Sequence, residues 1–357
     1  MNIAFFGSSL VSAYWNGAAT YYRGLVKELH HRGHRVTFYE PDALDRQAHR
    51  DIADPDWAEV VVYQADENAA LEVVELAQTA DIVVKASGVG VLDELLEEAV
   101  LDAKGNRLVV FWDVDAPATL ARMEADEQDP LRALVPRYDL IVTYGGGDPV
   151  VQRYLALNAP ECIPVYNAFD PETHHPVVPD GRFAADLAFL GNRLPDREVR
   201  VEQFFVEVAQ LMPERQFLLG GAGWQDRNLP QNVRLLGHLA PREHNAFNCT
   251  PLAVLNVLRE SMAANGWSPA TRVFEAAGAG ACVVSDVWAG IGDFLEPGRE
   301  ILVADSGRAV SELLERLTPA DARRIGDRAR QRVLAEHTYA RRAMQVEEIF
   351  TARAVTA

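Results

Sequence analysis

The feature that most constrains the fold of this chain is a regular alternation of short apolar runs and amphipathic segments. An apolar run at 2–7 ends in glycine, residues 17–31 follow with apolar side chains at helical spacing, and a second apolar run occupies 35–39. The same pattern repeats along the rest of the chain. It predicts parallel sheets of the doubly wound α/β class, in which ligands bind at the carboxyl ends of the strands.

The expected strands fall into two series, separated by a proline-rich stretch at 167–179. The first series is 2–7, 35–39, 60–63, 81–85, 108–112, 140–143 and 162–166, and the second is 187–190, 216–219, 233–236, 252–256, 281–285 and 301–303. A chain of 357 residues is also long for one hydrophobic core. We therefore expect two facing Rossmann-like domains with a cleft between them. The first would be 1–170, with a last helix at 340–357 packing back on it, and the second 171–339.

Composition excludes some partners and environments. The chain has 34 Lys and Arg against 52 Asp and Glu, and its net charge of −18 repels nucleic acid and anionic membrane surfaces. Its three cysteines form neither a disulfide framework nor a metal-binding spacing, which is typical of a cytoplasmic protein. We also expect no signal peptide and no transmembrane segment. Composition does not indicate the oligomeric state.

The stretch GWSPATRVFEAAGAGACVVS, at 266–285, places charged side chains at an expected helix start. We expect Ser268 to cap such a helix start with its side chain, because Pro269 suits the first helical position. Backbone N–H groups from Ser268 to Thr271 would then face a bound phosphate. Arg272 adds a charge in the first turn, and Glu275 is suited to accept hydrogen bonds from two sugar hydroxyls. The stretch indicates a nucleoside-diphosphate site. The alternative is a capped surface helix on which Arg272 and Glu275 form an i,i+3 ion pair.

A second group of polar and cationic side chains follows the strand expected at 187–190. It consists of Gly191, Asn192, Arg193, Arg197 and Arg200. A glycine at a strand end allows close backbone approach, and arginines beside it favour a pyrophosphate. The alternative is a set of solvated helix side chains, and we prefer it for at least one of Arg197 and Arg200. Two further strand ends carry the glycine-rich run 220–223 and His238. His238 is a candidate to lie beside a base, and the alternative is a structural histidine.

The first domain offers weaker candidates. Gly17 opens the first helix among small residues, as a phosphate-binding helix start does. Asp113 and Asp115 follow the strand expected at 108–112, and either is a candidate to orient or deprotonate a hydroxyl group. The alternative for Asp115 is that it caps the helix that starts near Pro117.

Several competing signatures are missing from the sequence, namely Walker A, GxGxxG, G-x-S-x-G, HExxH and CxxC. His174 and His175 are adjacent in the proline-rich stretch and make a poor chelating pair, so we expect solvated linker residues and no metal site. Cationic and amide donors can neutralise a leaving diphosphate without a metal.

Five segments, in order along most of the chain, resemble group-1 glycosyltransferases of the GT-B type, and among them the CgeB-like spore-maturation proteins. The segments are NGAATYYRGLVKELHHRGHRV, PVYNAFDPETHHP, FLGNRLPDREV, SPATRVFEAAGAGACVVSD, and EPGREILV followed by HTYARRA. The resemblance implies the GT-B fold of two facing Rossmann-like domains. It also implies the transfer of a sugar from a nucleotide sugar.

The resemblance implies roles for single residues. Glu275 corresponds to a ribose-binding glutamate, Arg193 to a phosphate-binding arginine, and Arg197 lies near the position of a family lysine. His238 follows the glycine of the base-contacting loop. The common pattern has a second glutamate eight residues before the ribose-binding one, and here that position is Trp267.

These observations predict a cytoplasmic glycosyltransferase of the hexosyltransferase type, independent of metal and without a resident cofactor. Its partners would be a nucleoside-diphosphate-sugar donor and a carbohydrate or other hydroxyl acceptor. Two alternatives stay open: a GT-B nucleotide-sugar epimerase, which needs no acceptor, and a non-catalytic nucleotide-sugar-binding protein, which Trp267 keeps open.

Overall fold

The computed structural model of the chain describes residues 1–14 and 16–354, and it divides into two compact units. Unit 1 contains Met1–Tyr166 and the segment from Tyr339 onward, and unit 2 contains Asn167–Thr338. The sequence predicts these boundaries after residue 170 and after residue 339. The end of the helix expected at 340–357, residues 355–357, lies outside the described residues.

Unit 1 is built around a sheet of seven parallel strands in the order β3-β2-β1-β4-β5-β6-β7. Its strands are β1 Asn2–Phe6, β2 Arg35–Asp42, β3 Glu59–Gln64, β4 Ile82–Ala86, β5 Leu108–Asp113, β6 Leu140–Thr143 and β7 Cys162–Pro164. The inner strands β4, β5 and β6 are buried along their whole length, as parallel strands covered on both faces are. The strand order reverses between β1 and β4.

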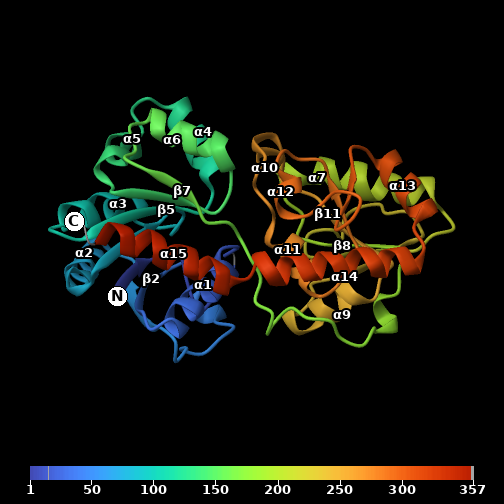
Figure 1. The fold of residues 1–357 in the computed structure, drawn as a ribbon, viewed down its shortest axis with the longest axis horizontal. Helices are drawn as coiled ribbons and strands as arrows, with labels where there is room; N and C mark the ends of the chain where they lie inside the picture. Colours follow the sequence, from blue (N-terminus) through green and yellow to red (C-terminus); the bar gives the residue numbers. More distant parts are fainter. Residues whose placement is uncertain (15, 355–357) are drawn as a thin grey trace. The chain divides into compact units, whose positions relative to one another are not determined.

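The helices of unit 1 cover this sheet. They are α1 Ala19–His31, α2 Glu67–Leu76, α3 Asp93–Asp102, α4 Ala116–Ala125, α5 Pro130–Leu134, α6 Gly147–Ala156 and α15 Tyr339–Ala354. Helix α15, in red in Figure 1, lies against α1. Two hydrogen bonds tie α15 to the edge of the sheet, from Nε2 of Gln345 to the carbonyl oxygen of Pro164 at 3.0 Å and from Nε of Arg353 to Glu161 at 2.7 Å. The end of the chain therefore completes the first unit.

Unit 2 contains a six-stranded parallel sheet in the order β10-β9-β8-β11-β12-β13. Its strands are β8 Leu187–Leu190, β9 Phe217–Gly220, β10 Val233–Gly237, β11 Ala253–Asn256, β12 Val283–Asp286 and β13 Leu302–Ala304. The order reverses between β8 and β11. Doubly wound sheets bind ligands at this reversal, beyond the carboxyl ends of the strands.

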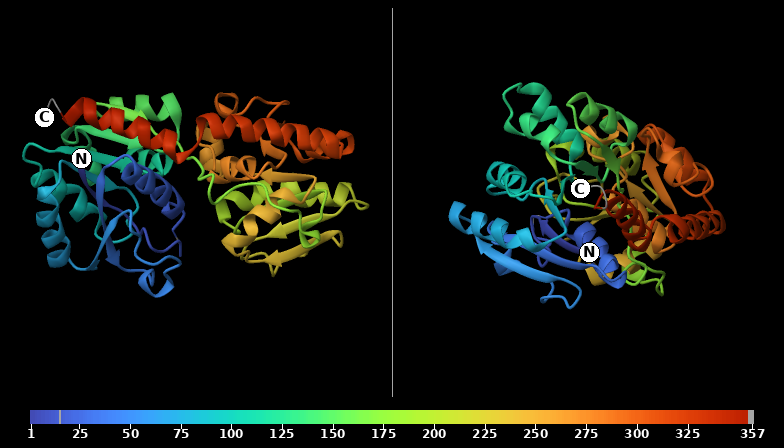
Figure 2. Two further views of the ribbon diagram at one scale, coloured as in Figure 1. Left: turned by 60° about the horizontal axis from the view of Figure 1, so that its bottom comes forward. Right: turned by 60° about the vertical axis from the view of Figure 1, so that its left-hand side comes forward.

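The helices of unit 2 follow the same alternation. They are α7 Pro195–Val201, α8 Glu207–Leu211, α9 His244–Cys249, α10 Glu260–Asn265, α11 Thr271–Gly278, α12 Ile291–Phe294, α13 Gly307–Arg316 and α14 Pro319–Glu336. A π-helical turn, Glu202–Val206, joins α7 to α8. Helix α14 packs against α11 and runs along one side of the unit, as the left-hand view of Figure 2 shows.

Every strand expected from the sequence is present, with ends shifted by a few residues at most. The α/β class with two Rossmann-like, parallel-sheet domains is therefore confirmed. In the described part of the chain, no helix combines the length and apolar character that crossing a membrane requires.

Candidate active site

The loops that leave β8 and β9 in unit 2 pack tightly on each other. The N–H of Arg193 donates to the carbonyl oxygen of Ala222 at 2.9 Å, and the N–H of Ala222 donates to Oδ1 of Asn192 at 3.0 Å. Gly221 has φ +117°, and a Cβ there would lie 2.2 Å from the carbonyl oxygen of Gly191. Glycine is required at this position because one loop backbone lies on the other. Asn192 therefore supports the loop.

Two arginines from different helices meet above Gly191, and we call them the cation pair. Arg197 lies on α7 and Arg272 in the first turn of α11. A Cβ on Gly191 would lie 3.0 Å from Nη2 of Arg197 and 3.2 Å from Nη2 of Arg272. Both guanidinium groups also lie over the ring of Phe189, at 5.7 and 5.3 Å from its centroid. The fold holds two like charges against the end of the same strand.

The cation pair lacks the partners that buried charges normally have. Arg197 donates from Nη2 to the carbonyl oxygen of Asn192 at 2.5 Å, but its Nε and the Nη1 of Arg272 are buried without a hydrogen bond. Neither arginine forms an ion pair within residues 1–14 and 16–354, so the surface pair of Arg272 with Glu275 does not form. Buried charges are stable only with partners, so this arrangement fits a bound anion.

The electrostatics of the cation pair follow from the same geometry. The pKa of Arg272 is lowered to about 9, chiefly by burial and then by the charge of Arg197, while the charge of Glu275 opposes the shift. Burial lowers the pKa of Arg197 as well, with Asp196 opposing the shift and Arg259 adding to it. An anion bound between the two arginines would raise both pKa values again, because it stabilises the charged forms.

The start of α11 differs from the sequence-based expectation. The helix begins at Thr271, its N-cap residue is Ala270, and no side chain caps it. Ser268 is 2% exposed, and its hydroxyl donates back to the carbonyl oxygen of Gly266 at 2.9 Å. The prediction that Ser268 caps the helix was therefore wrong, because the turn at 266–268 directs this hydroxyl to its own loop. The first backbone N–H groups of α11 stay available to an anion.

Glu275 lies one turn into α11 with its side chain 19% exposed, and two histidines surround it. Nε2 of His174 is 3.7 Å from Oε1 of Glu275, and the His174 side chain is only 14% exposed. The expectation of a solvated linker residue was wrong for His174. Burial lowers the pKa of His244; the charge of Glu275 and a hydrogen bond to the backbone of Leu239 raise it, and the charges of His174 and Arg272 lower it.

Sequence reasoning missed His244. It is the first residue of α9, which follows β10 after a short connection. A histidine shortly after a strand end was the available signal, but the same signal pointed to His238. His238 is exposed and makes no hydrogen bond with any described residue.

Arg193 and Arg200 are not part of the cation pair. Arg193 donates from Nη1 to Asp226 at 2.9 Å and from Nη2 to Glu198 at 2.8 Å, and these bonds raise its pKa. Arg200 is ion-paired with the buried Asp286 at 2.7 Å. Both charges are already compensated within the protein. Of the arginines that follow β8, Arg197 is therefore the one available to an anion.

In unit 1, Asp113 is completely buried at the end of β5. Its carboxylate accepts hydrogen bonds from Ser87 Oγ at 2.8 Å, Thr119 Oγ1 at 3.0 Å, Tyr154 Oη at 2.5 Å and the N–H of Asp115 at 3.0 Å. Burial raises the pKa of Asp113, and these donors lower it. A carboxylate with four donors and no exposure holds β5, α4 and α6 together, and it presents no free oxygen to a substrate hydroxyl.

The two other candidates of unit 1 lie at helix starts. Asp115 is the N-cap residue of α4, but its side chain makes no capping hydrogen bond. It lines a cavity of about 350 Å³ that also reaches Glu97 and Arg122. Gly17 is exposed just before α1, with open space where a Cβ would stand. Of the two carboxylates at the end of β5, Asp113 and Asp115, it is therefore Asp115 that can meet a ligand.

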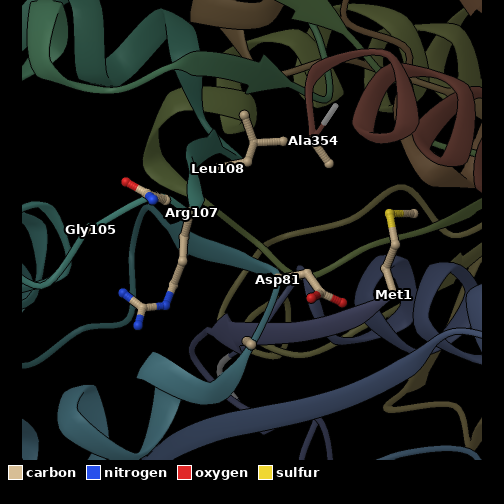
Figure 3. Close-up of a pocket in the computed structure, with 8 residues that line it drawn as sticks. Met1, Asp81, Gly105, Arg107, Leu108 and Ala354 are labelled. Carbon is tan, nitrogen blue, oxygen red and sulfur yellow. The ribbon is translucent and has the colours of Figure 1, made fainter. Parts of the chain in front are cut away.

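A cavity of about 600 Å³ lies at the amino ends of strands β4 and β5 of the same sheet (Figure 3). Its polar groups serve the fold. Arg107 donates to the carbonyl oxygens of Gln78 and Ala103, both at 2.7 Å, and Asp81 accepts from the N–H of Asn2 at 2.7 Å. Size alone does not make this cavity a site.

No group of three or more His, Cys, Asp or Glu side chains among residues 1–14 and 16–354 could hold a metal ion. Among the charged groups of unit 2, the cation pair and Glu275 are placed where a nucleotide could use them.

Comparisons with known proteins agree with this geometry. Residues 197–348 match the model of a family described as glycosyl transferase-like, and this segment includes the cation pair and Glu275. No curated protein sequence matches the chain.

Solved structures show the same fold over the whole chain. Sucrose-phosphate synthase from Thermosynechococcus elongatus is 15% identical with a TM-score of 0.74, and the match covers 100% of both chains. HepE from Anabaena, in complex with UDP and glucose, is 15% identical with a TM-score of 0.69 over 99% of this chain and 100% of that one. AviGT4, a glycosyltransferase involved in avilamycin A biosynthesis, is 14% identical with a TM-score of 0.65 over 100% and 99%. The chain thus has the GT-B glycosyltransferase fold.

Proposed function

We propose that this protein transfers a sugar from a nucleoside-diphosphate sugar to a hydroxyl group of a carbohydrate or other acceptor. The observation that carries the proposal is the cation pair. Arg197 and Arg272 are held together without a carboxylate partner in the described chain, at the strand reversal of unit 2. A diphosphate supplies the charge that they lack, and no sugar hydroxyl does so.

The proposed roles follow from position. Arg197, Arg272 and the first N–H groups of α11 bind the diphosphate and stabilise the charge that develops on it as the sugar leaves. Glu275 accepts hydrogen bonds from ribose hydroxyls, with His174 beside it. Because two guanidinium groups can neutralise the leaving group, we propose that the reaction needs neither a metal nor a resident cofactor. HepE has been solved with UDP-glucose, which supports a UDP-sugar as the donor.

The acceptor and the surroundings of the protein belong to the same proposal. Asp115, in the cavity of unit 1, is the residue we propose near the acceptor hydroxyl. Three free cysteines support a cytoplasmic protein. The resemblance to CgeB-like proteins within the group-1 glycosyltransferases rests on the sequence segments alone.

Calorimetric titration with UDP, GDP, ADP and TDP, and with the matching nucleosides, tests the site. We expect one diphosphate to bind at least about 100-fold more tightly than its nucleoside, because the nucleoside cannot reach the cation pair. Equal affinity for the diphosphate and its nucleoside would contradict the proposal. Products formed from the sugar derivative of that diphosphate, with and without hydroxyl acceptors, then separate transfer from epimerisation and from binding without turnover.

A further inference from the structure

Trp267 has a backbone conformation that a tryptophan rarely adopts. Its φ is +43°, and it is the one residue other than glycine with a positive φ in the described part of unit 2. A left-handed conformation is unfavourable for a bulky side chain, because its Cβ lies too close to the following carbonyl oxygen. Such a conformation persists only where the surroundings impose it, and strained residues of this kind gather at binding sites.

The surroundings that impose this conformation come from the turn after β12. The N–H of Trp267 donates to the carbonyl oxygen of Ala289 at 2.7 Å, and its indole Nε1 donates to Oδ2 of Asp293 at 2.7 Å. Gly290, with φ +86°, lies directly under the ring, and a Cβ there would be 2.3 Å from Nε1. The ring is therefore fixed from two sides.

The support beneath Asp293 is rigid as well. Its neighbour on α12, Phe294, is 3% exposed and packs against Trp288 and against Phe274 of α11, with ring centroids 5.8 and 5.9 Å apart. The indole and the carboxylate thus keep their relative position without a ligand, which is what a preformed binding surface requires.

Trp267 and Asp293 are not a core arrangement. The tryptophan is only partly buried and Asp293 is exposed. The indole N–H donates a hydrogen bond to Oδ2 of Asp293, and Oδ1 has no partner among the described residues. A strained tryptophan whose role was packing would gain from full burial. This one leaves part of an aromatic surface and a carboxylate oxygen accessible.

The position of Trp267 in the sheet order, relative to the cation pair, fits a donor sugar. The cation pair lies at the end of β8 and Trp267 lies at the turn after β12, and β8, β11 and β12 are consecutive neighbours. Two strand spacings amount to about 10 Å. A diphosphate held at β8 and a hexose attached to it span about this length, and the run from Trp267 leads directly into α11.

We infer that Trp267 and Asp293 bind the sugar ring of the nucleotide-sugar donor, an inference that rests on the proposed function. The apolar C–H face of a pyranose packs on the electron-rich face of the indole. Oδ1 of Asp293 accepts hydrogen bonds from ring hydroxyls. The carboxylate repels a second negative charge, so the surface selects a neutral hexose over a uronic acid.

The test compares the affinity for a nucleotide sugar with the affinity for its diphosphate alone. The probes are UDP with UDP-glucose and UDP-glucuronic acid, and GDP with GDP-mannose. The variants of the full chain are Trp267→Leu, which removes the ring, Trp267→Phe, which keeps a ring without the N–H, and Asp293→Asn. Leu211→Ala, an exposed position on α8, is the control.

We expect Trp267→Leu to weaken binding of the neutral nucleotide sugar about tenfold and to change diphosphate affinity less than twofold. Trp267→Phe should retain most of the affinity for the neutral nucleotide sugar. Asp293→Asn should reduce the preference for UDP-glucose over UDP-glucuronic acid. The sugar contribution is the ratio of nucleotide-sugar affinity to diphosphate affinity. If Trp267→Leu leaves this ratio unchanged, the inference is wrong and the proposed function stands. If the wild type binds none of UDP, GDP, ADP and TDP, both the inference and the proposed function are wrong.

Discussion

The two sheets carry charged side chains at the same topological position, the carboxyl ends of their parallel strands, but those side chains are compensated very differently. In unit 1, the fully buried Glu40 accepts from Ser9 Oγ at 2.9 Å and from the N–H of Leu10 at 2.6 Å. The fully buried Lys85 donates to Asp93 at 2.8 Å. Asp113 has four donors of its own. Each of these three charged groups is therefore satisfied by partners within unit 1.

The strand ends of unit 2 retain charges without partners. Arg197 and Arg272 keep buried N–H groups unbonded, and Trp267, which is bonded to the turn after β12, has a strained backbone. Native proteins satisfy nearly all buried polar groups, and those left unsatisfied are where function is expected. Arg46 of unit 1 also has an unbonded Nε, but its Nη1 donates to the carbonyl oxygens of Ser8 and Val89. The side chain of Arg272 makes no hydrogen bond with any described residue, and this difference supports the donor site that we propose in unit 2.

The largest expected effect tests the unsatisfied charges directly. Arg272→Met should weaken nucleoside-diphosphate binding about 100-fold, since it removes one of two cations that meet the diphosphate. It should also stabilise the free protein by about 2 kcal/mol, because a buried charge without a partner is replaced by an apolar side chain of similar length. Calorimetric titration and denaturant unfolding measure the two effects.

The matched control is Arg242→Met, which removes an exposed arginine of unit 2 and should change neither quantity. A less stable Arg272→Met variant with normal affinity would show that Arg272 is a structural residue. The comparison between the two strand ends would then no longer hold.

The second prediction tests the satisfied charges of unit 1. Asp113→Asn should destabilise the protein by about 2–4 kcal/mol, because an amide cannot accept from the four donors that now meet the carboxylate. Diphosphate affinity should stay within twofold of wild type. Asp115→Asn, whose side chain makes no capping bond, is the control and should cost less than about 1 kcal/mol.

A contrary result would be informative here. If Asp113→Asn retains full stability and loses turnover, Asp113 acts as the catalytic base that the sequence suggested, and the hydrogen bonds around it rearrange when substrate binds.

The fold was readable from the sequence because it rests on periodicity. Each strand is a short apolar run followed by a helical pattern, so the strands could be placed to within a few residues. Asp113 shows where such reasoning ends. A carboxylate after a strand has the same sequence signal whether it faces a substrate or four internal donors. Two of the side chains that decide the matter, Ser87 and Tyr154, are 26 and 41 residues away from Asp113 in the sequence.

The candidate site was readable only in part, for the same reason. The sequence indicated phosphate-binding arginines after β8 and in the stretch around Glu275. It could not show that Arg193 meets Asp226 and Glu198 while Arg197 meets Arg272, since these partners are set by the sheet order. His174 was assigned to a linker because nothing local indicates that it lies beside Glu275.

The third prediction sharpens the comparison within unit 2. Arg193→Met should weaken diphosphate binding less than tenfold, because Asp226 and Glu198 already compensate this charge. The measurement is the ratio of its diphosphate affinity to that of Arg272→Met under the same conditions. A loss as large as that of Arg272→Met would mean that Arg193 leaves both carboxylates to bind the ligand, as its resemblance to a phosphate-binding arginine implies.

The smallest expected effect is a dependence of stability on pH. Folding lowers the pKa of Arg272 from its ordinary value to about 9, so below pH 9 the side chain is protonated in both states and the folded protein bears the full cost of the buried charge. Above pH 9 the folded state loses this proton first, and that cost is relieved by about 1.4 kcal/mol per pH unit. The stability advantage of Arg272→Met over wild type should therefore be constant from pH 7 to about 8.5 and shrink by about 1 kcal/mol at pH 10. Denaturant unfolding of both proteins across this range measures the difference, in which the titration of all other groups cancels. A difference that stays constant to pH 10 would mean that Arg272 keeps its charge compensated in the free protein, and the contrast between the strand ends of the two units would be smaller than the geometry indicates.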